Sequence, residues 1–161
     1  MQTNEEKISY WIETYGDMVL RLAVSYLKNL QDAEDIVQTV FMTLFQKNPV
    51  FEHPEHEKAW ILRSTINACK NKRKLFWNRN VCSMEEIAEP SYQEEKDSTV
   101  LDAVMSLSAP YRVAVYLYYY EGYKTAEIAK IIGKREATVR SLLHRAREQL
   151  KQKLTEEYDF A

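Results

Sequence analysis

Apolar residues recur every three or four positions near the start of the chain, a spacing that favours amphipathic helices over strands. The first such stretch runs from Ile8 to Leu27. The second covers Gln31–Lys47, where Asp32 is placed to cap a helix. The apolar side predicted for this second helix consists of Ile36, Val37, Val40, Phe41, Leu44 and Phe45. Two helices that each bury one side are therefore expected before residue 48.

A break in this pattern separates the second helix from a third. Pro49 and Pro54 disfavour helix at the residues that precede them, so Asn48–Glu57 is expected to be a loop. Helical spacing then returns over Lys58–Phe76. The inward positions of this third helix are Leu62, Ile66 and Cys69. The sequence thus predicts a three-helix module in about the first eighty residues.

Two shorter helical patterns meet at Gly133, within Lys124–Leu150. Thr125 supplies an oxygen that could cap the first, and Gly133 can take the positive φ of a tight turn between helices. The apolar side of the second helix consists of Val139, Leu142, Leu143, Ala146 and Leu150. This spacing predicts a helix-turn-helix whose second helix could lie in a major groove. A pair of bundle helices with a solvated charged side is the alternative.

The stretch Asn80–Ser98 has few apolar residues, one Pro and no sustained period. It reads as a flexible acidic linker, with a short helical turn over Met84–Ala88. The predicted fold class is therefore all-α. Two small helical modules, residues 5–79 and 99–154, flank a linker at 80–98, and the second module ends in the helix-turn-helix.

Composition narrows the cellular setting. No apolar run approaches the roughly eighteen residues of a membrane span, and no signal peptide opens the chain, so a cytoplasmic protein is expected. Cys69 and Cys82 are then most simply free thiols. His53 and His56 could be drawn with them as a metal site. Because H-x-x-H in a Pro-containing loop is not a standard ligand spacing, no metal site is expected.

The net charge of −2 conceals two basic blocks. Residues 58–80 hold seven Lys/Arg and no acid, whereas the segments before and after, 1–57 and 81–102, each carry a net charge of −6. A second basic block, 133–153, has a net charge of +5. Two local patches can each bind phosphates, although the protein as a whole will not coat nucleic acid indiscriminately.

The first basic block places its polar residues on one side of the third predicted helix. Arg63, Asn67, Lys70 and Lys74 fall within an arc of about 60°, and Trp60 and Asn71 flank that arc. Cations that bind the backbone, amides that read base edges and an aromatic ring that can stack suit single-stranded or melted DNA. Trp60 could equally be an anchor in the core.

Three runs of sequence together resemble a known family. The runs DAEDIVQTVFMTLFQK (Asp32–Lys47) and AWILRSTINACKNKRK (Ala59–Lys74) resemble the second domain of bacterial sigma factors of the sigma-70 family. The run TAEIAKIIGKREATVRSLLHRAREQLKQKL (Thr125–Leu154) resembles their fourth domain. A small chain with only a linker between these domains is similar to the extracytoplasmic-function (ECF) group.

The resemblance implies roles for residues of the first module. Asp32, Glu34, Asp35 and Gln38 match the surface that docks on the clamp helices of the largest RNA polymerase subunit. Acids at a helix start also have a simpler explanation, since the helix dipole favours them there. The loop Phe51–Glu57 matches the one that captures a flipped base of the −10 element. The residues expected to contact −10 DNA are Phe51, His53, Trp60, Arg63, Asn67, Lys70, Asn71 and Lys74.

In the second module the resemblance implies recognition of the −35 element. The residues that match the DNA-facing positions are Thr138, Arg140, Ser141, His144 and Arg145. Lys134 and Arg135 stand where the family usually has a small apolar residue and a capping Ser, and Leu142 stands where an Arg is frequent. In the first module, Thr39 replaces a frequent acid. These departures leave the −35 sequence unpredicted.

The expected function is that of a sigma factor without chemistry of its own. It would bind core RNA polymerase and promoter DNA and, by resemblance, an anti-sigma factor, either membrane-bound or free. No cofactor, catalytic residue or direct membrane association is expected. The main alternative is a stand-alone transcriptional regulator that binds duplex operator DNA as a dimer through the helix-turn-helix. That alternative assigns no function to the basic block at 58–80. A nuclease is disfavoured, since no carboxylate cluster accompanies the basic surfaces.

Overall fold

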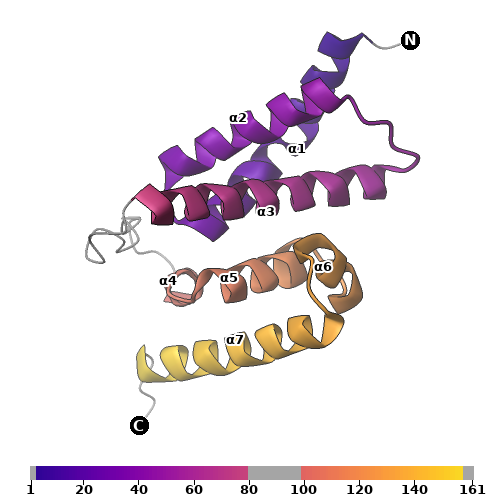
Figure 1. The fold of residues 1–161 in the computed structure, drawn as a ribbon. Helices are drawn as coiled ribbons and strands as arrows, with labels where there is room; N and C mark the ends of the chain where they lie inside the picture. Colours follow the sequence, from indigo (N-terminus) through magenta and orange to yellow (C-terminus); the bar gives the residue numbers. More distant parts are fainter. Residues whose placement is uncertain (1–2, 80–98, 158–161) are drawn as a thin grey trace. The chain divides into compact units, whose positions relative to one another are not determined.

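The computed structural model describes residues 3–79 and 99–157, which form helices joined by turns, with no strand among them. The chain divides into two compact units, Met1–Ser91 and Tyr92–Ala161. Figure 1 shows α1, α2 and α3 in the first unit and α4 to α7 in the second. The predicted all-α fold is confirmed. The proposed linker at 80–98, including Met84–Ala88, lies outside the described residues.

Helix α1 (Asn4–Leu27) begins with a reciprocal cap. The Thr3 hydroxyl accepts a hydrogen bond from the Glu6 N–H at 3.2 Å, and the Thr3 N–H donates to Glu6 Oε2 at 3.1 Å. The helix continues through Gly16 and ends at Lys28, whose φ is 56°. Its buried residues are Trp11, Tyr15, Met18, Val19, Leu22 and Ala23. These residues form the side of α1 that packs on α2 and α3, whereas Ile12, which helical spacing also predicts on this side, is 49% exposed.

Helix α2 (Leu30–Lys47) corrects two predictions. Its cap is Asn29, whose Oδ1 accepts from the Asp32 N–H at 2.9 Å, so the assignment of Asp32 as the cap is wrong. Asn29 is in extended conformation just before the helix, and Asp32 already lies inside its first turn. Phe45 is also not in the core, with 46% of its surface exposed. It lies one position past Leu44, the last buried residue of α2.

Helix α3 (Pro54–Arg79) begins four residues before its predicted start. The loop is therefore 48–53, and the assignment of Pro54–Glu57 to it is wrong. Proline fits the first helical position because that N–H needs no partner inside the helix and its φ is already helical. The His53 carbonyl accepts from the Glu57 N–H at 3.1 Å, which closes the first turn. The buried residues of α3 are Ile61, Leu62, Thr65, Ile66 and Cys69.

The second unit is built from shorter helices. They are α4 (Thr99–Met105), α5 (Ala109–Val115), the π-helical turn η1 (Tyr116–Tyr120), α6 (Thr125–Ile132) and α7 (Glu136–Glu157). Arg112 is fully buried, and its guanidinium donates to the Leu107 carbonyl between α4 and α5. This bond supplies a partner for a buried charge and a buried carbonyl at once. No described helix of either unit is both long and apolar enough to cross a membrane.

The helix-turn-helix is formed by α6 and α7. Gly133 ends α6 with φ of 70°, as predicted. The assignment of Thr125 as the cap of α6 is wrong, because the helix already begins there and Lys124 stands at the cap position. The Lys124 N–H donates to Glu127 Oε1 at 3.0 Å. The Thr125 hydroxyl instead donates to Glu136 Oε1 at 3.0 Å, which ties the first turns of the two helices together.

Candidate nucleic-acid interface

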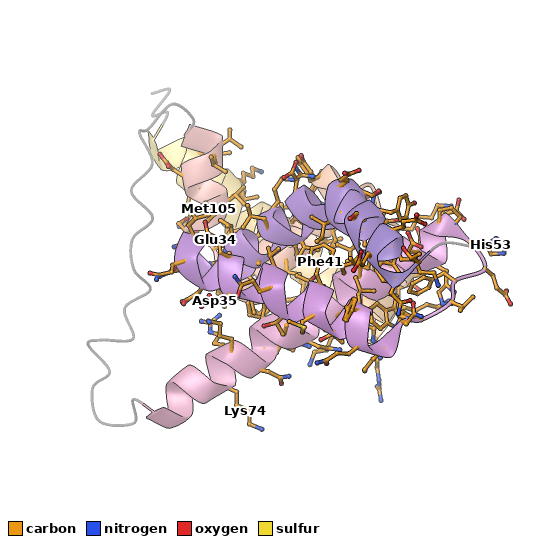
Figure 2. All side chains as sticks on the ribbon, turned by 90° about the horizontal axis from the view of Figure 1, so that it is seen from above. Glu34, Asp35, Phe41, His53, Lys74 and Met105 are labelled. Atoms are coloured by element: carbon orange, nitrogen blue, oxygen red, sulfur yellow. The ribbon has the colours of Figure 1, made fainter. Side chains whose placement is uncertain are left out.

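An acidic surface lies on the first turns of α2. Glu34, Asp35 and Gln38 are exposed and Asp32 is half-exposed, so the structure brings all four predicted docking residues to one surface. Figure 2 shows Glu34 and Asp35 near one end of the α1–α3 unit, with His53 near the other. The acidic residues and the loop before α3 therefore lie toward opposite ends of this unit.

A lysine of the basic helix pairs with this acidic surface. Lys72 Nζ lies 3.0 Å from Asp35 Oδ2 and 3.8 Å from Asp32 Oδ1. The sequence did not single out Lys72, because the pair joins residues 37 positions apart and depends on how α3 packs on α2. The one feature of the sequence that could have indicated this role is the position of Lys72 on α3, about half a turn away from Arg63 and the exposed cationic side. Part of the acidic charge is thus balanced within the unit.

The exposed side of α3 carries the residues predicted to contact melted DNA. Arg63, Asn67, Lys70, Asn71 and Lys74 are all exposed on α3. On the opposite side, burial raises the pKa of the Cys69 thiol to about 12, so this cysteine is an uncharged core residue. Cys82 lies outside the described residues. One side of α3 therefore packs and the other presents charge and amides.

An aromatic cluster covers the start of α3. The Phe51 ring meets the Trp60 ring edge-on, with centroids 5.8 Å apart at 64°, and the His56 ring at 6.0 Å and 82°. Phe51 and Trp60 are both half-buried, which leaves part of each ring open to a stacking partner. His53 is exposed and makes no ring contact with this cluster. His56, which the sequence prediction had not included, takes that place.

Glu57, in the first turn of α3, interacts with Tyr15 of α1. Burial and then a hydrogen bond with Glu57 raise the pKa of Tyr15, so its hydroxyl stays protonated. The other oxygen, Glu57 Oε1, is buried without a hydrogen-bond partner among the described residues. A buried oxygen without a partner costs free energy. No three His, Cys, Asp or Glu side chains of the described ranges are grouped as a metal site would require.

The recognition surface on α7 is exposed as the spacing predicts. The residues open to solvent are Thr138, Arg140, Ser141, His144 and Arg145, while Val139, Leu143 and Ala146 are buried on the other side. Arg140 Nη1 lies 3.0 Å from Glu136 Oε1, the same oxygen that accepts from the Thr125 hydroxyl. Glu136 therefore orients Arg140 and links it to α6, a role that the sequence prediction missed.

A second arginine of α7 is held by aromatic rings. Arg147 Nε donates to the Tyr119 hydroxyl at 2.6 Å, and its guanidinium carbon lies 5.4 Å from the centre of the Tyr118 ring and 5.6 Å from that of Tyr119. The hydrogen bond to Tyr119 raises the pKa of Arg147. The signal in the sequence was the run YLYYY at 116–120, which stands directly before the helix-turn-helix.

Comparisons with known proteins place a match in each unit. The family model described as Sigma-70 region 2 matches residues 11–75, and that described as Sigma-70, region 4 matches residues 98–150. The RNA polymerase sigma factor SigV of Bacillus subtilis is 28% identical over 160 residues, which cover 97% of this chain and 96% of SigV. The ECF RNA polymerase sigma factor SigL of Mycobacterium tuberculosis is 28% identical, with coverage of 83% and 81%.

A solved structure has a similar fold. It is the sigma factor RpoE of Bartonella quintana in complex with the anti-sigma factor NepR. Its TM-score to this chain is 0.77 at 23% identity, with coverage of 92% of this chain and 97% of that one.

Proposed function

We propose that three exposed surfaces of this chain each bind one partner in transcription initiation: core polymerase, the −10 element and the −35 element. The chain belongs to the sigma-70 family, in its extracytoplasmic-function group. As a sigma factor, the chain binds core RNA polymerase and directs initiation at specific promoters. The observation that carries this function is that region 2 and region 4 each match one of the two units. A stand-alone helix-turn-helix regulator would account for the second match only.

The acidic surface of α2 is the proposed polymerase-docking site, through Asp32, Glu34, Asp35 and Gln38. Its charge suits a basic partner, and electrostatic complementarity speeds association and fixes orientation. Lys72 already holds Asp35 at 3.0 Å, so a cation of the partner must replace or share this contact. Docking therefore competes with, or adds to, an ion pair within the unit.

The aromatic cluster and the exposed side of α3 are the proposed −10 site. The half-buried Phe51 and Trp60 rings offer stacking surfaces, and Asn67 stands among cations on the same helix. Stacking on an aromatic ring is worth about 1–3 kcal/mol per base, comparable to the few kcal/mol of unstacking. Capture of a flipped base would therefore offset the few kcal/mol of unstacking that base, and strand opening needs no ATP in this proposal. The other residues assigned to this site are His53, Arg63, Lys70, Asn71 and Lys74.

The exposed side of α7 is the proposed −35 site, through Thr138, Arg140, Ser141, His144 and Arg145. A helix of this kind presents its first turns to base edges in a major groove. Arg145 has no acid paired with it in the described residues, whereas Arg140 is held by Glu136. Arg145 is therefore assigned the main base contact, and Arg140 a contact that must first release or share Glu136.

The remaining expectations complete the proposal. The chain works in the cytoplasm as a factor without cofactor or catalytic step, and its activity is controlled by an anti-sigma factor. The proposal of an anti-sigma partner is supported by RpoE, which has a similar fold and was solved in complex with the anti-sigma factor NepR.

The test is run-off transcription with core polymerase and fragments of the source genome. Discrete transcripts that require both core polymerase and this chain are the expected result. Tight, sequence-specific binding to duplex DNA by the chain alone, with no transcript from any fragment, would favour the stand-alone regulator instead.

A further inference from the structure

The feature of the second unit without a role so far is the group formed by Arg147, Tyr118 and Tyr119, here called the arginine–tyrosine site. We propose that it binds a phosphate of the promoter backbone beside the −35 element. This inference rests on the proposed function of α7 as the −35 recognition helix. It adds a phosphodiester site that lies outside the five residues assigned to that element.

Arg147 is an exposed cation in a fixed position. Its Nε donates to the Tyr119 hydroxyl at 2.6 Å, and both rings lie within 6 Å of the guanidinium carbon. The two tyrosine rings are themselves packed edge-on at 4.9 Å and 73°. An arginine normally loses side-chain entropy when it binds, and one that is already fixed loses less. The site is therefore preorganised.

The groups that remain unused fit a phosphate. No described carboxylate pairs with Arg147. The hydroxyls of Tyr119 and Tyr118 are its polar partners, which leaves other N–H groups of the guanidinium available to donate. The Tyr119 hydroxyl accepts from Nε, so its own proton is available to donate. A guanidinium edge and an adjacent hydroxyl can bind two oxygens of one phosphate. The planar guanidinium suits such two-point binding better than the ammonium group of lysine does.

The position on α7 favours DNA over a protein partner. Arg147 lies seven residues after Arg140, so the two point to within about 20° of each other and are about 10 Å apart along the helix. Exposed His144 and Lys151 lie on the same side. A stripe of cations along the edge of a recognition helix faces a polyanion, and phosphate contacts fix such a helix in register.

The two arginines of this stripe are held differently. Glu136 balances the charge of Arg140, whereas phenol and ring surfaces hold Arg147 without neutralising it. The tyrosines of η1 also have different partners. The Tyr116 hydroxyl donates to an acid, Glu121, at 2.8 Å, whereas the Tyr119 hydroxyl accepts from Arg147. The π-helical turn presents two consecutive tyrosines to one guanidinium, and π-helical turns occur frequently at functional sites.

The test measures how promoter affinity depends on salt. Holoenzyme reconstituted with Arg147→Gln is titrated on a promoter fragment that the run-off assay identifies, over a range of KCl concentrations. Loss of one phosphate contact reduces the magnitude of the slope of log K against log salt by about 0.9. Discrimination between this fragment and one with an altered −35 element is expected to stay unchanged.

Two further variants separate the site from a general loss of charge or fold. Lys153→Gln removes a cation from the same helix, but Lys153 lies about 120° around α7 from Arg147, where it contacts Ser106, so the slope is expected to stay at the wild-type value. Tyr119→Phe keeps the ring and removes the hydroxyl, so affinity is expected to fall less than in Arg147→Gln. Far-ultraviolet circular dichroism checks that each variant is folded.

Ethylation interference identifies the contact itself. One phosphate whose ethylation weakens the wild-type complex is expected to lose its effect in Arg147→Gln. A wild-type slope and an unchanged ethylation pattern in folded Arg147→Gln would overturn the inference. Weaker assembly with core polymerase at an unchanged slope would also overturn it and assign the site to a protein.

A failure of the proposed function would be visible separately, as the absence of any run-off transcript with the wild-type chain. In that case the same salt titration is made with the full chain alone on duplex DNA without promoter sequence. A smaller slope for Arg147→Gln there would still support a phosphate site, and an identical slope would contradict it.

Discussion

Two basic helices, α3 and α7, carry the candidate DNA surfaces, and they are built differently. On α3 the exposed cations stand beside half-buried aromatic rings, and Lys72 reaches across to an acid of the neighbouring helix. On α7 the polar residues lie in the open, and the bonds that orient them come from the helix-turn-helix itself. The first arrangement suits an unstacked base, and the second suits the edge of a duplex. Similar charge density thus supports two modes of recognition.

The largest expected effect comes from removing one leucine from the core beneath each surface. Leu62 in the first unit and Leu143 in the second are 0% and 1% exposed. Each leucine-to-alanine change should lower the free energy of unfolding by about 2–5 kcal/mol, because it leaves a cavity. Hydrogen exchange followed by mass spectrometry should show faster exchange in the unit that carries the change.

The matched control for these variants is Leu101→Ala. Leu101 is 47% exposed, so the change should alter stability by less than about 1 kcal/mol. A loss for Leu62→Ala or Leu143→Ala no greater than that of this control would mean that the assigned cores are wrong.

Charge reversal at the acidic surface comes next. Asp35→Arg should weaken binding to core polymerase by about 2–5 kcal/mol, since it puts like charges together where a close ion pair is proposed. Gln38→Ala should weaken it less. Co-purification with core polymerase measures both, and Glu13→Arg, an exposed acid of α1, is the control. Undiminished binding of folded Asp35→Arg would remove the docking assignment.

Arg145→Ala addresses the duplex-reading side of the comparison. It should reduce discrimination at the upstream promoter element by about 1–3 kcal/mol, the value of a bidentate base contact. Arg140→Ala should have a smaller effect, because Glu136 already holds this arginine. Competition between promoter fragments with intact and altered −35 elements measures the discrimination. If discrimination survives and only the salt slope falls, Arg145 contacts a phosphate and the base contact belongs to Ser141 or His144.

The smallest effect is expected at Lys72. This ion pair is largely exposed, so Lys72→Gln should change stability by less than about 1 kcal/mol. Binding to core polymerase should become tighter, because Asp35 is freed for the partner. Surface plasmon resonance with immobilised core polymerase measures the affinity, with Lys74→Gln as the control on the exposed side of the same helix. Weaker binding by Lys72→Gln would mean that Lys72 holds Asp35 in its docking position.

Periodicity in the sequence was enough to predict α1, α2, α3, α6 and α7 and the exposed sides of α3 and α7, whereas α4, α5 and η1 were not predicted one by one. Such patterns depend on residues three and four apart, which local spacing records directly. The cap positions failed for the opposite reason. Asp32 and Thr125 are both good capping residues, but the chain enters the helix before each of them, at Asn29 and at Lys124. Capping preference alone does not say where the extended backbone ends.

The contacts that orient the site residues could not be predicted from the sequence. Lys72 meets Asp35, and Arg147 meets Tyr119, across 37 and 28 positions of the chain. Such pairs depend on the angle and register at which helices pack, which composition does not give. The loop that contains Phe51 was predicted in the right place, but its predicted end at Glu57 was too late, because α3 already begins at Pro54.

The most direct test of the division of labour between α3 and α7 is permanganate reactivity of thymines near the start site, measured on holoenzymes that carry Asn67→Ala or Arg145→Ala. Gln46→Ala, an exposed amide of α2, is the control. We expect Asn67→Ala to form the closed complex without thymine reactivity, and a pre-melted bubble template to restore its transcription. Arg145→Ala should instead lose promoter selectivity, with normal opening once it is bound at high concentration. Normal opening by Asn67→Ala on linear duplex, or the same defect in both variants, would contradict the account.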